Sequence, residues 1–205
     1  MSASERRCFA AAAEGFVTAV GGVGSEDWSR PGLGVWSVRD LVGHTSRSFT
    51  TIETYLADPP AEIVLHQPVE YLQAVRGAGL ESEAIVARGR AAGVALGEDP
   101  LAAIGELATR VLAMVAATPD EAPMRTFAGG AQLGTYLPTR TFELTVHTLD
   151  LTTALGQDPP AILQEPIAAC LALAAAVAGA GGGSGAVLLQ ALTGRRALPP
   201  GFSII

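Results

Sequence analysis

The sequence predicts an all-α fold, a helical bundle with up to four long helices and a short helical C-terminal extension. Apolar residues recur with the helical period in several long segments, and Gly and Pro clusters separate these segments. Hydrophobic residues make up 49% of the 205-residue chain, which is ample for one sizeable core. We therefore expect one domain with a modest addition: a bundle over 1–157 and a helical extension over 158–205.

The first half should contain two long helices. The first is expected over about 4–20, where an Ala-rich apolar stretch runs into a Gly-rich break. Ser37 is a good N-cap for the second, and Trp36 just before it is placed for a hydrophobic staple. This helix should end near Ala57, before Asp58-Pro59-Pro60. Its apolar residues form one helical stripe: Val38, Leu41, Val42, Phe49, Ile52 and Leu56.

The middle of the chain reads as shorter elements. A linker over 58–68 precedes helical patterns at 69–76 and 80–96, and Asp99-Pro100 opens a helix that Pro119 closes. The Gly-rich segment 119–136 is expected to be a loop. Strands at 61–66 and 124–128 remain alternatives.

The last part of the chain should again be helical. Pro138 is expected to begin a helix that Gly156 ends. A very Ala-rich helix over about 162–178, a glycine break and a short helix ending at Leu192 should follow. The tail from Leu198 is expected to be extended.

Charge and composition exclude several functions. A net charge of −7, a pI near 4.9 and no basic cluster argue against nucleic-acid binding. No uninterrupted apolar run reaches the ~18–20 residues of a membrane span, and the N-terminus is a poor secretory signal. Cys8 and Cys170 are expected to be buried thiols rather than a disulfide, which favours a cytoplasmic protein. The Ala, Gly and Arg usage with almost no Lys is typical of a high-GC, for example actinobacterial, genome.

One of only three histidines, His147, follows Glu143 by four residues. Side chains at this spacing share a helix face and can reach one metal ion. Arg140 and Asp150 belong to the same stripe of the helix. Two interpretations of this stripe stay open, a solvated outer face and a metal-binding face.

His44 provides a third candidate ligand at the edge of the apolar stripe of the second helix, where it can point into a cleft between helices. Asp40, one turn earlier, could accept its second ring N–H and orient it. Together with Glu143 and His147 it gives the His/Glu/His set of a catalytic zinc with one open position. A boundary histidine bound to water is the alternative for His44, and His66 is expected to lie on the surface.

The segments Trp36-Ser-Val-Arg-Asp-Leu-Val-Gly-His44 and Arg140-Thr-Phe-Glu-Leu-Thr-Val-His147-Thr-Leu-Asp150 together resemble the two signature blocks of the mycothiol-dependent maleylpyruvate isomerase family. This family belongs to the DinB-like metalloenzymes, and the similarity covers roughly residues 5–157. The resemblance implies a four-helix bundle that binds Zn²⁺ through His44, Glu143 and His147, with mycothiol as the fourth ligand. The zinc-bound thiolate would add to a small unsaturated anionic substrate and leave after isomerisation, or stay attached in an S-transferase.

The resemblance also implies a substrate-binding arginine, which the fuller family enzyme takes from a larger C-terminal domain. Only a short segment follows Gly156 here, so Arg140 is the geometric alternative. A hydrolase with zinc-bound water, for which Asp150 is the candidate base, and a non-catalytic metal-binding module are the competing hypotheses. The expected partners are a small substrate and a low-molecular-weight thiol, with no nucleic acid and no membrane, in a monomer or homodimer.

Overall fold

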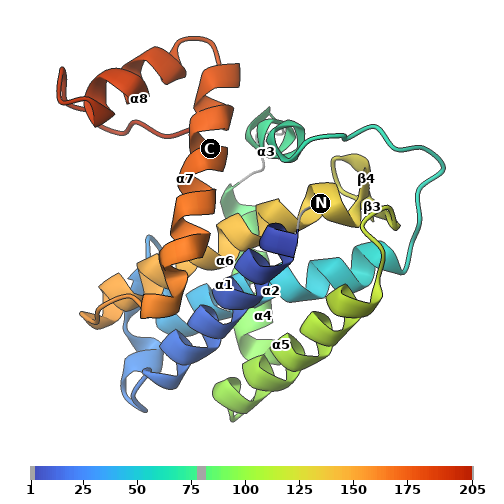
Figure 1. The fold of residues 1–205 in the computed structure, drawn as a ribbon. Coiled ribbons are helices and arrows are strands. Elements are labelled where there is room, and N and C mark those ends of the chain that lie inside the picture. Colours follow the sequence, from blue (N-terminus) through green and yellow to red (C-terminus); the bar gives the residue numbers. More distant parts are fainter. Residues whose placement is uncertain (1–2, 78–81, 205) are drawn as a thin grey trace.

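The structure, a computed structural model, describes residues 3–77 and 82–204 (Figure 1). Four long helices form a bundle, in which α1 and α2 each pack against both α5 and α6. Their bounds are Ala3–Gly21 for α1, Val38–Leu56 for α2, Pro100–Ala117 for α5 and Leu133–Leu155 for α6. The predicted all-α four-helix bundle is confirmed.

The core lies between these four helices. Phe9 and Phe49 meet edge to face with ring centroids 6.3 Å apart, and Phe16, two turns after Phe9 on α1, also packs against Phe49. Most of the predicted stripe of α2 is buried in this core, namely Val38, Leu41, Val42, Phe49 and Ile52. Burial of these side chains is the main favourable contribution to the fold.

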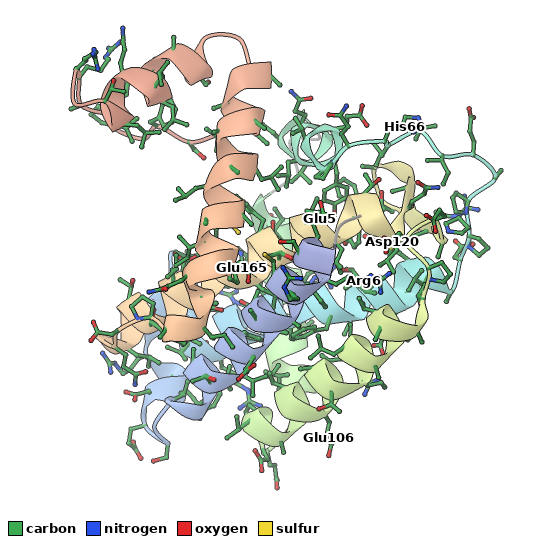
Figure 2. The ribbon with its side chains drawn as sticks, viewed as in Figure 1. Glu5, Arg6, His66, Glu106, Asp120 and Glu165 are labelled. Carbon is green, nitrogen blue, oxygen red and sulfur yellow. The ribbon has the colours of Figure 1, made fainter. Side chains whose placement is uncertain are left out.

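Arg6 joins α1 to the end of α5. Its guanidinium pairs with Asp120, and it also donates to the carbonyl oxygens of Val115 and Thr118 (Figure 2). These carbonyls lie at the C-terminal end of α5, where the regular backbone hydrogen bonds of the helix run out; the Val115 carbonyl also accepts a long bond from the N–H of Thr118. A side chain of α1 therefore caps α5 and fixes the two helices end to end.

Two shorter helices flank the bundle: α3 (Pro68–Gly77) contacts α6 and α7, and α4 (Ser82–Ala95) packs against α2. Residues 80 and 81 of the predicted helix lie outside the described residues. Helix α4 packs closely against α2, and glycine at position 43 makes this possible. A Cβ on Gly43 would come within 2.1 Å of the backbone nitrogen of Gly93. Arg39 Nε donates to the Gly93 carbonyl at 2.9 Å across the same contact.

The described residues contain two small antiparallel hairpins. One pairs β1 (Pro31–Leu33) with β2 (Trp36–Ser37), and the other pairs β3 (Pro123–Thr126) with β4 (Gly129–Gln132). The second hairpin replaces most of the predicted Gly-rich loop, and a single parallel bridge joins Leu65 to Ala131. Strand formation is favoured because Met124 and Thr126 alternate inward, onto the end of the bundle.

Helix α6 begins at Leu133, five residues before the predicted start at Pro138, and this prediction was wrong. The N–H groups of Leu133 and Gly134 donate to the carbonyls of Ala122 and Asp120, so the segment between α5 and β3 caps the first turn. Pro138 therefore lies inside the helix, near its N-terminal end, where it removes one backbone donor. The predicted end at Gly156 is confirmed, with Gly156 in the left-handed conformation at φ +68°.

The C-terminal segment contains α7 (Gln164–Ala180) and α8 (Ser184–Leu192), preceded by a 3₁₀ turn at Ala161–Leu163; a second 3₁₀ turn lies at Asp27–Ser29. Helix α7 contacts α1, α3 and α6, and α8 lies at its far end, away from the bundle (Figure 1).

By length and composition, Pro100–Ala117 and Ala161–Ala180 could each cross a membrane. The first of these segments is α5 of the bundle, and core helices of soluble proteins meet the same test.

Candidate metal centre

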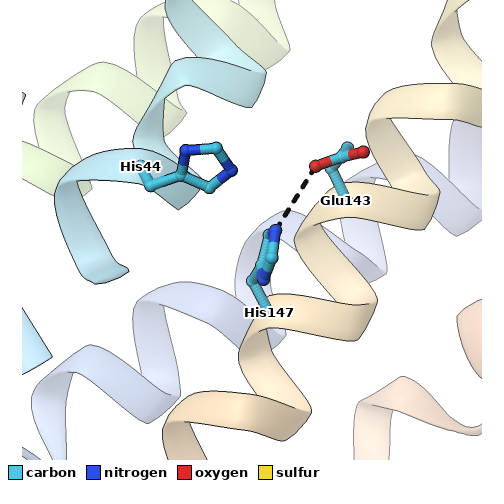
Figure 3. Close-up of side chains that lie close together, drawn as sticks. All are labelled: His44, Glu143 and His147. Carbon is cyan, nitrogen blue, oxygen red and sulfur yellow. Dashed lines mark ion pairs between the residues drawn. The ribbon is translucent and has the colours of Figure 1, made fainter. Parts of the chain in front are cut away.

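The three predicted ligands converge between α2 and α6 (Figure 3). His44 comes from α2, Glu143 and His147 come from consecutive turns of α6, and one donor atom of each lies within 4.8 Å of the other two. The packing of α2 against α6 brings them together, although about 100 residues separate them in sequence. The side chains of Glu143 and His147 are only 24% and 15% exposed, so this part of the α6 stripe faces α2 rather than open solvent.

Glu143 and His147 form an ion pair, with His147 Nε2 3.4 Å from a Glu143 carboxylate oxygen. Burial alone would raise the pKa of Glu143, but the hydrogen bond from His147 and the charge of Arg140 outweigh it and hold that pKa at about 2. Burial alone would lower the pKa of His147, but hydrogen bonds to Asp150 and Glu143 raise it to about 9. Without a metal, His147 is therefore a cation between two carboxylates.

Asp150 lies behind His147. One of its carboxylate oxygens is 2.9 Å from His147 Nδ1, the ring nitrogen opposite the one that faces Glu143. A carboxylate in this place keeps the proton on Nδ1 and leaves Nε2 for a metal, as is usual for a ligating histidine. Asp150 thus makes with His147 the contact that was predicted between Asp40 and His44.

No carboxylate of the described residues bonds to His44 in this way, and the prediction that Asp40 orients it was wrong. Asp40 accepts from the backbone N–H of Ser37, while Ser37 Oγ accepts from that of Asp40, so the carboxylate is used in a capping box. His44 Nδ1 is buried without a hydrogen-bond partner among the described residues. Burial and the nearby charge of His147 lower the pKa of His44 to about 4, which leaves its imidazole neutral at pH 7.

These side chains fit a divalent cation. Two imidazoles and one carboxylate are the donors that zinc accepts in catalytic sites, and three protein ligands leave one position open. The carboxylate is already ionised, one imidazole is already neutral, and Figure 3 shows a ring nitrogen of His44 directed toward Glu143 and His147. Only His147 has to lose a proton before all three can bind.

A cavity of about 550 Å³ opens over the three side chains. Its wall carries three arginines, and among the described residues Glu143 is the only acidic one that lines it. These arginines are Arg47, Arg88 and Arg140, and none of them forms an ion pair with another residue of 3–77 or 82–204. The cavity therefore combines a possible cation site with positive charge on its walls.

Arg140 is held in this wall by aromatic rings. Its guanidinium carbon lies 4.7 Å from the ring centroid of Tyr136 and 5.4 Å from that of Tyr71, within the range of cation–π attraction. Its Nε donates to Thr139 Oγ1 at 3.2 Å, and the residue is only 7% exposed. The rings offset part of the desolvation of the cation, and the charge of Glu143 also favours it, but Arg140 forms no direct ion pair in the described chain.

Sequence reasoning missed several residues of the cavity. Arg47 follows His44 by three residues on α2, so the spacing that suggested Glu143 and His147 could also have indicated it. Arg88 and Tyr71 come from helices whose packing the sequence did not reveal. Trp36 was interpreted only as part of a helix start, yet its ring lies on that of His44, with centroids 4.4 Å apart.

The remaining candidates lie elsewhere. His66 is exposed in the segment before α3 (Figure 2), as predicted, and its backbone N–H donates to Glu70. Cys8 and Cys170 are free and buried, also as predicted. Both line a separate cavity of about 280 Å³ between α1, α6 and α7.

Comparison with known families agrees with this geometry. A family model described as the mycothiol maleylpyruvate isomerase N-terminal domain matches residues 9–152. The chain belongs to this family. The matched region holds α2 and α5, most of α1 and α6, and all three residues of the candidate metal centre. No match was found among curated proteins or among solved structures.

Proposed function

We propose that the protein is a zinc- and mycothiol-dependent isomerase or S-transferase, which acts on a small, unsaturated and anionic electrophile. The observation that carries this proposal is the convergence of His44, Glu143 and His147 at the base of a cavity, in a chain of this family. When bound, the zinc would accept a low-molecular-weight thiol and lower its pKa below the usual ~8.5, which makes the thiolate available at neutral pH.

The chain would contribute ligands and orientation. His44, Glu143 and His147 would hold the ion, and Asp150 would hold His147 in the tautomer that ligation needs. Arg140 would bind a carboxylate of the electrophile, because its guanidinium is fixed between two rings beside the ligands and has no ion-pair partner in the described chain. Arg47 and Arg88 add positive charge to the same cavity.

The hydrolase hypothesis has less support. It requires a general base near the open ligand position, and Asp150 was the candidate. Asp150 is 2.9 Å from His147 Nδ1 and does not line the cavity, so a positioning role suits it better. A non-catalytic module would need no arginine-lined cavity. We also propose that the protein is cytoplasmic, because its two cysteines are free thiols, and that it is a monomer or homodimer.

Metal content and thiol dependence test this proposal together. The purified protein should contain one zinc per chain by mass spectrometry, and should convert a panel of unsaturated carboxylates and other electrophiles only when mycothiol is added. A variant with Cys8→Ser and Cys170→Ser should keep most of this activity, because neither thiol is suited to be a nucleophile. Burial raises the pKa of both thiols, that of Cys170 to about 11, and so disfavours the reactive thiolate. Full turnover without any thiol would support the hydrolase, and absence of bound zinc would contradict both enzymes.

A further inference from the structure

The two histidines of the candidate centre are held in different ways. His147 is held by a carboxylate at Nδ1, the usual means of fixing a ligating imidazole. His44 Nδ1 is buried and has no hydrogen-bond partner among the described residues. A ring without such a bond can rotate about its Cβ–Cγ bond unless packing prevents it. Something else must keep His44 directed toward Glu143 and His147.

Trp36 occupies one face of the His44 ring. The two ring centroids are 4.4 Å apart and the planes are inclined by 32°, so the indole covers the imidazole at van der Waals distance. On another side, His147 meets His44 edge to face, with centroids 4.9 Å apart. Rotation of the imidazole would drive its edge into the indole.

The indole itself is fixed by α4. Trp36 Nε1 donates to the Val86 carbonyl at 3.3 Å. Gly89, one turn later on α4, leaves room for the ring, since a Cβ there would lie 2.9 Å from Cε2 and Cζ2 of the indole. Trp36 is only 8% exposed. A hydrogen bond and close packing from one helix thus hold the surface against which His44 rests.

We propose that Trp36 is a positioning residue for the metal centre, and that its indole, clamped by α4, fixes the His44 imidazole in place of a hydrogen-bond acceptor. This inference rests on the proposed zinc site and deepens it. It assigns to Trp36 and Gly89 an effect on metal affinity, although neither supplies a ligand atom.

Zinc affinity is the first test, measured by competition with a chromophoric chelator. Trp36→Leu keeps an apolar side chain but removes the aromatic face, and should raise the zinc dissociation constant by about 10–100-fold, as loss of an outer-shell partner does. Trp36→Phe keeps an aromatic ring and should recover most of the affinity. Trp28→Phe, at a tryptophan that does not line the cavity, should leave affinity unchanged. Thermal unfolding should verify that each variant is folded.

A matched pair of glycine variants tests the clamp without altering Trp36. Gly89→Ala inserts a methyl group against the indole, whereas Gly105→Ala on α5 meets nothing within 4 Å. Both replace a helical glycine by alanine, so they gain similar helix propensity. Only Gly89→Ala should weaken zinc binding and alter the visible absorption spectrum of the Co²⁺-loaded protein, which reports the geometry of the ligands.

The outcomes separate this inference from the proposed function. Unaltered zinc affinity and an unaltered Co²⁺ spectrum in both Trp36→Leu and Gly89→Ala would overturn the role of Trp36, while the zinc site would stand. Failure of the unaltered protein to bind Zn²⁺ would overturn the site and the positioning role together. If Trp36→Leu does not fold, the Gly89→Ala and Gly105→Ala pair decides the question alone.

Discussion

At the scale of single residues, the environment of each imidazole sets its charge. His44 lies against an indole and beside a cation, and both burial and that charge disfavour its protonated form. His147 lies between Glu143 and Asp150, which outweigh its burial and favour the protonated form. Two histidines whose ring centroids are 4.9 Å apart therefore carry different charges at neutral pH. This difference determines how many protons a metal must displace.

Zinc binding should release about one proton per ion at pH 7. His147, with its pKa raised to about 9, is protonated in the metal-free protein, whereas Glu143 and His44, at about 2 and about 4, are already deprotonated. Affinity should therefore rise with pH up to about 9 and then level off. Titration calorimetry in buffers of different ionisation enthalpy measures the release.

Asp150→Asn provides the control for this measurement. It removes a carboxylate that raises the pKa of His147, so fewer protons should be released at pH 7. Binding enthalpies that do not depend on the buffer in the unaltered protein would show that His147 is not the proton donor.

Glu143→Gln should weaken zinc binding by more than about 100-fold, the upper value for loss of an outer-shell partner, while the bundle stays folded. The amide keeps the shape of the side chain but loses the charge that offsets the dication. Glu53→Gln is a matched control, because Glu53 forms its ion pair with Arg110 outside the cavity. Chelator competition and thermal unfolding measure both effects. Equal zinc occupancy in the two variants would mean that Glu143 is not a ligand.

At the scale of elements, the sequence predicted what depends on local pattern. The stripe of α2, its Ser37 cap, the Asp99-Pro100 start of α5 and the Gly156 end of α6 all follow from neighbouring residues, and all are confirmed. The ligand trio was predicted in the same way, from spacing on α6 and the position of His44 on the stripe of α2.

What the sequence did not predict depends on contacts between distant segments. The first turn of α6 is capped by carbonyls of the preceding loop, which no spacing rule indicates. The hairpin of β3 and β4 is stabilised by packing on the bundle rather than by strong β-formers, as its Gly129-Gly130-Ala131 sequence shows. Asp40 had two possible partners at similar sequence distance, Ser37 and His44, and its carboxylate is used in the capping box with Ser37.

The contact between α2 and α4 yields a stability prediction. Gly43→Ala should lower the free energy of unfolding by about 1–3 kcal/mol, because the new methyl group would overlap the backbone of Gly93 and force the helices apart. This cost should exceed the gain of up to about 1 kcal/mol in helix propensity. Urea unfolding measures it against Gly105→Ala, which should be neutral or stabilising. Equal stability of the two variants would show that α4 can move away freely.

At the scale of the whole molecule, the charge of the cavity opposes that of the chain. The protein carries a net charge of −7, yet three arginines and one glutamate line the cavity. A small anion is repelled by the molecule as a whole and attracted only within this wall, where desolvation strengthens charge interactions. The arrangement favours substrates small enough to enter the cavity over large polyanions.

Truncation should show how the C-terminal segment relates to the bundle, and whether the proposed division into 1–157 and 158–205 holds. A chain that ends at residue 182 lacks α8 and the segment after it; no residue of α8 is buried, its main contacts are with α7, and Ile204 is only partly buried. Its unfolding temperature should stay within about 4 °C of the full chain, a change below about 1 kcal/mol.

A chain of residues 1–157 should melt lower, because α7 and the 3₁₀ turn before it bury Leu163, Cys170 and Val177 against the bundle. It should still bind zinc, since all three ligands lie within it. Thermal unfolding and chelator competition on both chains measure this, and a 1–157 chain that fails to fold would show that the extension is part of the same folding unit.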